Sequence, residues 1–399
     1  MKIWAKNITF LSLILLVSAC GNQKNQASTG AINNFKLAIV DSIQVDIFAN
    51  YLSLVDVQDG TGNILALRNG PPTAYILDPK GKVIRKFERP GDDPRGVGNS
   101  IHSGEFYEDG VALMGQMRLK TYDMEFKVRK SLKPHYSPTG MFFSGYNHLI
   151  EFGNENKQLF AFFGGPQVNT SPLKKEFYEQ YNIADIVDPN LVISNESLTT
   201  ELSNAELFKP IGEFTQDSKY LSGRAFYFIT PVFDVKDNDL IYAFKDDTTL
   251  YKRQLPSGEM FEQYKIPFDK FINFNGYAMG PAGIAEQDKP SDRSGRILKV
   301  FSVDGFDIVN YHSGMKMSEM QKFDKTSPDI RQILAKEDYQ KYLILKDGQR
   351  MNTRLRIPEK IASLIISDDQ GYIWAQKDLS DIDEEPEFIT FYKLKVVTD

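Results

Sequence analysis

The sequence predicts an all-β fold that is assembled from a repeated strand motif. Three observations support this prediction: short apolar or alternating runs recur along the chain, hairpins with polar tips follow several of them, and aromatic residues are abundant. The 399 residues include 28 Phe and 19 Tyr, which favour strands, and 28 Gly and 19 Pro, which favour turns. A strand unit repeated in this way is typical of a β-propeller, in which four-stranded sheets pack radially around a channel.

Six of the recurring runs begin at a turn signal and have the pattern of a buried strand. They are GNILALRN (62–69), DGVALMGQ (109–116), YNHLIEFG (146–153), NDLIYAFKDD (238–247), GRILKVFS (295–302) and QGYIWAQKD (370–378). We interpret each run as the inner strand of one blade, which predicts a six-bladed propeller over residues 35–399. A β-sandwich or barrel would use the same short strands, but the chain is too long for one sandwich and its strand patterns continue to the last residues.

Three hairpin patterns follow these runs and predict the outer strands of blades. They are AYILDPKGKVIRKF (74–87), TLYKRQLPSGEMFEQYKI (249–266) and YLILKDGQRMNTRLRI (342–357), each with Gly in its turn. A closed ring also needs a partner for its last blade, because an open ring would expose strand edges. We expect FKLAIVDSIQVDIF (35–48) to pair with EFITFYKLKVV (387–397) and to complete one blade.

Two stretches interrupt the strand pattern, at residues 166–222 and 314–341. Within them SPLKKEFYEQYN, SEMQKF and DIRQILAKEDYQKY have apolar residues at three- and four-residue steps, which predicts helices. We interpret both stretches as partly helical insertions in the propeller, placed to meet a partner or to cap the channel.

The first 34 residues predict export followed by a flexible tether. Lys2 and Lys6 precede the apolar run ITFLSLILLVSA, which is shorter than the roughly 20 residues needed to span a bilayer. The only cysteine, Cys20, follows Val-Ser-Ala, and this segment resembles the lipobox of bacterial lipoproteins. The resemblance implies a signal peptide over residues 1–19 and lipid attachment at Cys20. Residues 20–34 are small and polar and predict the tether.

The residues that follow Cys20 also predict a location. Gly21 is not the aspartate that retains many lipoproteins in the inner membrane, and no acidic cluster of surface lipoproteins follows. By analogy we expect a protein of the cell envelope, anchored to the outer membrane and facing the periplasm. The alternative is a buried cysteine beside an ordinary signal peptide or a short anchor.

Composition argues against several functions. The net charge is −6 and no basic cluster occurs, so we expect no nucleic-acid partner. Cysteine chemistry is excluded beyond Cys20, and neither a G-x-S-x-G nor an H-E-x-x-H motif is present. The four histidines, at positions 102, 135, 148 and 312, are far apart in the sequence. We therefore assign no catalytic residues, no metal site and no cofactor.

Two acidic segments, VDVQDGTGN (55–63) and FDVKDNDL (233–240), place oxygen-bearing side chains at alternate positions, a pattern compatible with Ca²⁺. Neither segment has the twelve-residue loop that ends in glutamate, so we interpret them as turns. The glycine-rich segment PGDDPRGVGNSIHSG (90–104) lacks the Gly-Lys-Ser/Thr ending of a phosphate loop and predicts a loop that crosses one face.

For a small ligand at the channel, we select Arg95 and His102 on the 90–104 segment as candidate contacts. Arg224, which follows the first insertion, is the third candidate.

The chain resembles the exported six-bladed β-propeller proteins of Bacteroidetes-type bacteria, which are related to TolB-like and NHL-like propellers. The resemblance covers the lipobox, the strand pattern and a motif of the form G-x-x-G-x-G-P-G-E-F after the first hairpin. In this chain Gly91, Pro94 and Gly96 match that motif loosely, and its end corresponds to Gly104-Glu105-Phe106 after a short insertion. The resemblance implies a fold and a location, and no particular reaction.

The predicted function is a binding or scaffold role for a protein partner or a small ligand, without catalysis. Two alternatives use the channel: a hydrolase or lyase acting on glycans, and a ligand sensor or accessory protein of nutrient uptake. Arg, His and acidic residues gathered at one channel mouth would favour these alternatives. A channel filled by aromatic side chains would favour the scaffold.

Overall fold

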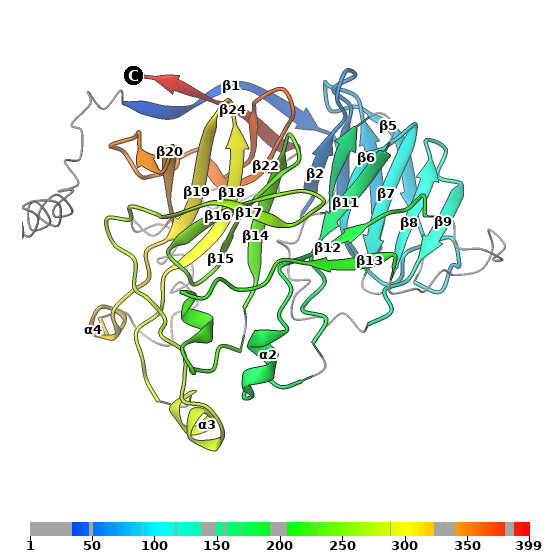
Figure 1. Ribbon diagram of the computed structural model, residues 1–399. Coiled ribbons are helices and arrows are strands. Elements are labelled where there is room, and N and C mark those ends of the chain that lie inside the picture. The colour runs from blue at the N-terminus through cyan, green and yellow to red at the C-terminus, as the bar shows by residue number, and fades with distance from the viewer. Residues whose placement is uncertain are drawn as a thin grey trace, which may run out of the picture. The chain divides into compact units, whose positions relative to one another are not determined.

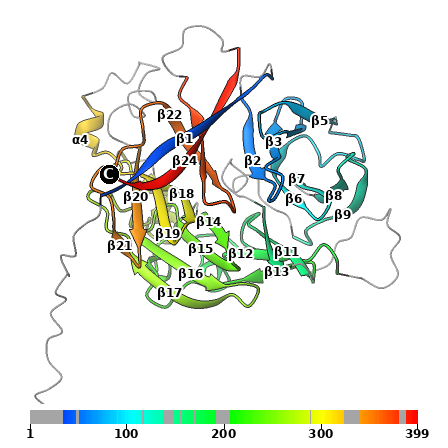
Figure 2. The same ribbon diagram turned by 90° about the horizontal axis from the view of Figure 1, so that it is seen from above.

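Six four-stranded antiparallel sheets surround a common axis in the computed structural model (Figures 1 and 2). The structure describes residues 34–47, 51–89, 91–115, 118–136, 149–154, 157–168, 170–191, 206–227, 229–287, 289–322, 340–379 and 387–399. The predicted all-β, six-bladed propeller is confirmed. Among the described residues, none of the helices has the length and apolar character needed to cross a membrane.

Each blade is one sheet whose four strands follow one another from the axis outward. Blade 1 contains β2 (Ser53–Val57), β3 (Ile64–Arg68), β4 (Thr73–Leu77) and β5 (Val83–Glu88), and blade 2 contains β6 (Ile101–Tyr107), β7 (Gly110–Gly115), β8 (Leu119–Asp123) and β9 (Val128–Leu132). Blade 3 contains β10 (Ile150–Asn154), β11 (Lys157–Phe162), β12 (Ala184–Val187) and β13 (Phe208–Ile211), and blade 4 contains β14 (Pro231–Lys236), β15 (Asp239–Phe244), β16 (Thr249–Gln254) and β17 (Glu259–Lys265). Blade 5 contains β18 (Arg296–Val303), β19 (Phe306–His312), β20 (Gln340–Lys346) and β21 (Gln349–Arg350), and blade 6 contains β22 (Ile361–Ser367), β23 (Ile373–Lys377), β24 (Ile389–Thr398) and β1 (Phe35–Val45).

The two ends of the described chain close the ring together in blade 6. Strand β1 pairs with β24 from Phe35 opposite Thr398 to Val45 opposite Ile389, as predicted. The backbone N–H of Asp399 donates to the carbonyl of Asn34 at 2.8 Å, so the closure extends to the last residue. The ring therefore has no open blade at its seam.

The six runs predicted as inner strands fall in six different blades, but only two of them are innermost. The runs at 146–153 and 295–302 overlap β10 and β18, whereas the other four correspond to the second strands β3, β7, β15 and β23. A second strand is buried on both faces and therefore forms the most continuous apolar run. The true inner strands β2, β6, β14 and β22 carry polar residues that line the axis, which makes their pattern weaker.

The outer hairpins are confirmed as β4–β5, β16–β17 and β20–β21. In four outermost strands one residue is bulged: Val40 in β1, Ile84 in β5, Arg129 in β9 and Phe261 in β17. A bulge twists an edge strand and interrupts its row of free backbone groups, which hinders edge-to-edge pairing with another chain.

Each seam between neighbouring blades contains an apolar cluster, and the largest lies between blades 3 and 4. A buried ionic contact supplements the seam between blades 4 and 5. There Asp307, 5% exposed, accepts the Tyr264 hydroxyl at 2.5 Å and pairs with Lys252 at 2.9 Å. Close packing at these seams restricts the relative motion of the blades, so the ring holds the loops on its two faces in place.

The predicted insertions differ from the structure in their extent. Residues 166–222 include two strands of blade 3, β12 and β13, so this stretch is only partly an insertion. The second insertion ends before Gln340, where β20 begins. The short helix α2 (Lys175–Glu179) lies in the first predicted helical segment, and α4 (Met317–Met320) overlaps the second. Of the third, DIRQILAKEDYQKY, residues 329–339 lie outside the described residues, and Gln340–Tyr342 are strand instead of helix because they pair with β19. The 3₁₀ helix η1 (Lys219–Leu221) also lies in the first insertion, and α3 (Pro281–Gln287) lies in an insertion between β17 and β18 that the pattern did not predict.

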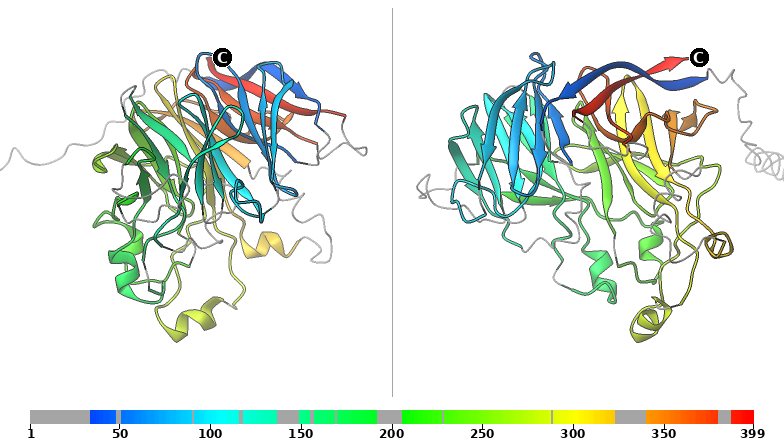
Figure 3. Two further views of the ribbon diagram at one scale, coloured as in Figure 1. Left: turned by 90° about the vertical axis from the view of Figure 1, so that its right-hand side faces the viewer. Right: turned by 180° about the vertical axis from the view of Figure 1, so that it is seen from behind.

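The α-helices α2, α3 and α4 lie on one face of the propeller (Figures 1 and 3). They occupy connections between second and third strands, or between an outer strand and the next blade, and antiparallel order brings these connections to the same end. We call this end the insertion face. The opposite end, which carries the short turns within the inner and outer hairpins, is called the turn face, and Asn34 and Asp399 lie there.

Candidate functional site

The axial channel contains a cavity of about 80 Å³. Its polar lining comes from every blade: Asp56, Glu105, Glu151, Asp234, Lys236, Lys299, Ser302, Ser367, Asp368 and Asp369. The walls between these groups are apolar and include Val57, Phe233 and Phe301. Among the described residues, six carboxyl groups thus share one cavity with two lysines, an imbalance that favours bound protons or another cation.

The channel carboxyls also connect inner strands of different blades. Asp56 in blade 1 accepts the backbone N–H of Phe106 in blade 2 at 2.6 Å. Asp234 in blade 4 accepts the N–H of Ser302 in blade 5 at 2.8 Å and the Ser367 hydroxyl of blade 6 at 2.6 Å. These carboxyls therefore have a structural role besides any role toward a ligand.

Burial and mutual repulsion shift the titration of the channel groups. Burial raises the pKa of Asp56 to about 7 and that of Asp234 to about 6. Burial, with the nearby Asp369 carboxylate, raises the pKa of Glu151 to about 7. Burial and the neighbouring carboxylates hold the pKa of Glu105 well above its usual range. Burial lowers the pKa of Lys299 to about 7. The cavity therefore holds several protons on the acidic side of neutrality.

A second candidate surface covers the insertion face over blades 3 to 5. We call it the insertion layer, and it comprises the described residues of 163–183, 212–230, 266–295 and 313–322. Its segments are joined by backbone hydrogen bonds, which run in both directions between Ala225 and Tyr277 and between Arg293 and Met315. The hydroxyl of Tyr178, a residue of α2, accepts the N–H of Phe226 at 2.7 Å. The four segments therefore form one continuous surface.

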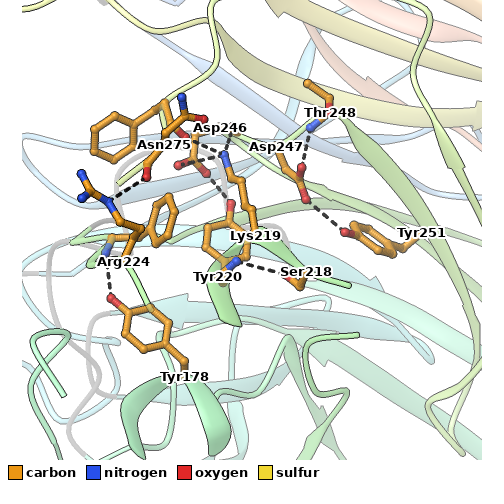
Figure 4. A network of polar contacts seen from close by, with 12 residues as sticks. Tyr178, Ser218, Lys219, Tyr220, Arg224, Asp246, Asp247, Thr248, Tyr251 and Asn275 are labelled. Carbon is orange, nitrogen blue, oxygen red and sulfur yellow. Dashed lines mark hydrogen bonds and ion pairs between the residues drawn. The ribbon is translucent and has the colours of Figure 1, made fainter. Parts of the chain in front are cut away.

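Lys219 on η1 belongs to a network of polar contacts in the layer (Figure 4). Its ammonium pairs with the Asp246 carboxylate at 3.5 Å and donates to the carbonyl of Phe274 at 3.2 Å. The Tyr220 hydroxyl donates to the same Asp246 carboxylate. Burial raises the pKa of Asp246, and the nearby Lys219 opposes that shift. This one side chain thus links an insertion, a turn of blade 4 and the strap of residues 266–295.

Aromatic rings pack against the residues of this polar network. Tyr220 packs against Phe214, Phe226 and Phe244 with centroids 4.8 to 5.0 Å apart. Such tilted and edge-to-face pairs contribute about 0.5–1.5 kcal/mol each beyond the area that they bury. The abundant Phe and Tyr of this region therefore serve as core, which is the role that close packing of insertions on blades requires.

None of the three predicted ligand contacts lines the axial cavity. Arg95, with 63% of its side chain exposed, binds Asp93 at 2.9 Å above blade 2. The ring of His102, at the start of β6, lies 2.9 Å from the Ser100 hydroxyl. Arg224 belongs to the insertion layer, where it donates to the carbonyl of Gly276 at 2.8 Å and pairs with Glu286 at 3.3 Å. The structure therefore places Arg224 within the layer's own contacts.

The described part of the chain contains no group of three or more His, Cys, Asp or Glu side chains arranged to hold a metal ion. In the two segments considered for Ca²⁺, the turns use left-handed residues such as Gly60 and Asp237, as expected of turn chemistry. The expectation that no cofactor is bound at these turns stays a prediction. Cys20 and His148 lie outside the described residues.

Sequence reasoning missed the channel carboxyls, although their signal is visible. An acidic residue lies between small or apolar neighbours in four inner strands, as Val-Asp-Val, Gly-Glu-Phe, Ile-Glu-Phe and Phe-Asp-Val. A charge inside a buried strand is costly unless it faces a polar cavity, so this pattern identifies the axis of the ring.

Comparison with known proteins agrees with this architecture. No family model matches the chain, and no curated protein sequence matches it. A member of the DUF4221 family from Bacteroides vulgatus has a similar structure, with a TM-score of 0.60 at 10% identity over 92% of this chain and 99% of its own. A putative exported protein from Bacteroides fragilis aligns with a TM-score of 0.49 at 12% identity over 93% of this chain and 97% of its own. At such low identity the similarity to the DUF4221 member shows the fold alone.

Proposed function

We propose that this protein is a lipid-anchored binding protein of the cell envelope that presents its insertion layer to a protein partner. The observation that carries this proposal is the continuous layer on one face, joined by backbone bridges and by Lys219. Two large apolar side chains on this layer face solvent, Leu221 at 39% and Ile284 at 54% exposure. Rigid, partly apolar surfaces of this kind are suited to protein recognition.

A binding role is supported over glycan chemistry by the size of the axial cavity. Its volume of about 80 Å³ is well below the roughly 300–1,000 Å³ of typical ligand pockets. A sugar ring with its flanking residues would require the blades to separate.

The predicted signal peptide, the lipobox that ends at Cys20 and the resemblance to exported TolB-like and NHL-like propellers support the envelope location in this proposal.

The partner surface is tested by photo-crosslinking in cells. A photo-crosslinking amino acid at Ile284 is expected to give a discrete protein adduct. The matched control is Ile84, an apolar residue of similar size that is 41% exposed on the outer strand β5. Equal adducts at both positions, or adducts at Ile84 alone, would contradict the proposed surface.

Lipid attachment at Cys20 is tested separately. Cys20→Ser is expected to abolish incorporation of labelled fatty acid and to move the protein from the membrane fraction to the soluble fraction. The reason is that stable attachment requires the acyl chains that the cysteine carries. Labelled protein that persists in the Cys20→Ser variant would disprove lipidation at this position.

A second candidate function is the sensing of a small organic cation in the channel. The excess of carboxyls over lysines in the described lining of the cavity favours it. An alkylammonium ion is expected to raise Tm more at pH 8 than at pH 5, because more carboxyls are then ionised. The uncharged propionamide serves as the control, and a shift independent of pH would count against this function.

A further inference from the structure

Blade 6 depends on titratable groups for its contacts across the channel. On the side of blades 4 and 5 these contacts are attractive. Lys236 pairs with Asp369 at 3.1 Å, the Ser367 hydroxyl donates to Asp234 at 2.6 Å, and Lys299 donates to the carbonyl of Ile365 at 3.0 Å. Two lysines thus hold the inner edge of the blade that closes the ring.

On the side of blades 1 to 3 the described lining of the cavity contributes carboxyls and no lysine. Asp56 on β2, Glu105 on β6 and Glu151 on β10 all face the cavity that Asp368 and Asp369 of blade 6 also line. The charge of Asp369 acts on Asp56, Glu105 and Glu151 and opposes their ionisation. Ionisation of these three groups would therefore push blade 6 away from blades 1 to 3.

We propose that the channel carboxyls form a pH-dependent clasp on blade 6. The ring is closed on the acidic side of neutrality, and the seam between blades 1 and 6 loosens as the pH rises. The carboxyls of the clasp lie at the axis of the ring, so this proposal does not depend on the function proposed for the insertion layer.

The direction of the effect follows from the titration of each group. Carboxyls with raised pKa values bind more protons in the closed ring than in an opened one, so closure weakens between about pH 4 and pH 7. Lys299 acts in the opposite direction, because burial lowers its pKa to about 7 and an opened ring would keep the lysine proton above that pH, so its effect favours closure as the pH rises beyond about 7. The carboxyl effect is therefore read between about pH 5 and pH 7, before most of the lysine loses its proton.

Trp374 is placed to report on this seam. It is 1% exposed, packs in the apolar cluster between blades 6 and 1, and its indole N–H donates to Asp368 at 2.8 Å. The other tryptophan is Trp4. In the full-length chain in detergent, Trp4→Phe leaves Trp374 as the only tryptophan, and its quenching by acrylamide measures access to the seam.

We expect quenching to rise roughly twofold between about pH 5 and pH 7 at a temperature well below unfolding. The variant Glu105→Gln/Glu151→Gln in the same background is expected to abolish the rise. Glu151→Gln alone should reduce it and serves if the double variant does not fold. Glu176→Gln on the exposed part of α2 is the matched control and should leave the rise unchanged. The proposed clasp is wrong if quenching stays constant in the parent chain, or if it rises in both channel variants as much as in the parent chain.

Discussion

Removal of β1 is expected to abolish cooperative folding of the propeller. Strand β1 buries Leu37, Ile43 and Val45 against blades 5, 6 and 1. Each buried aliphatic side chain contributes about 1.5–3 kcal/mol, so the loss of about 5 kcal/mol or more is comparable to the whole stability of a domain. Urea unfolding of a chain that begins at residue 48, compared with one that begins at residue 34, measures this loss.

Rescue in trans separates ring closure from a general defect. A synthetic peptide of residues 34–47 should restore the unfolding transition, because it adds the missing strand to β24. A point variant gives a second check. Ile43→Asp is expected to unfold the chain, whereas Ser42→Asp on the exposed side of the same strand is expected to be tolerated. If the urea midpoint of the chain without β1 is unchanged, β1 is not needed to complete blade 6.

Lys219→Met is the second change with a large expected effect. It removes the partner of the mostly buried Asp246 carboxylate and leaves the carbonyl of Phe274 without its charged donor. Breaking such a pair costs about 2–4 kcal/mol. Because the contact joins three segments, we expect the insertion layer to loosen while the ring stays folded. Hydrogen exchange of residues 212–227 and 266–287 measures that loosening.

Two further variants serve as a control and a rescue for Lys219→Met. Lys175→Met removes an exposed ion pair with Glu179 on α2 and should leave hydrogen exchange of the layer nearly unchanged, because solvent screens such a pair. Lys219→Met combined with Asp246→Asn should recover much of the loss, because the buried charge is then removed while Tyr220 keeps an acceptor. Exchange that rises equally in the blades and in the layer would mean that Lys219 stabilises the whole propeller instead.

The number of blades could be predicted because it depends on a local apolar pattern. Each second strand is buried on both faces, so runs such as Val111–Met114 are apolar throughout and appear once per blade. Their assignment as inner strands was wrong for four blades for the same reason. An inner strand carries a polar side chain toward the channel, and this lowers its apolar signal.

The candidate sites depended on residues that are distant in the sequence. Asp56 and Asp369 are in one cavity because the ring closes, and Lys219 meets Phe274 because two insertions cross the same face. No local pattern encodes either contact. Arg224 was selected for its position after an insertion, and its carbonyl and carboxylate partners come from another insertion altogether.

The all-β class, the six blades, the outer hairpins and the pairing of β1 with β24 could be predicted from the sequence. These features follow from periodicity and turn chemistry, which act over a few residues. The folded ring was needed to show which strand faces the axis, how the carboxyls of separate blades share one cavity, and how the insertions join into a layer. Those properties arise from closure of the ring, which brings together side chains that no local rule relates.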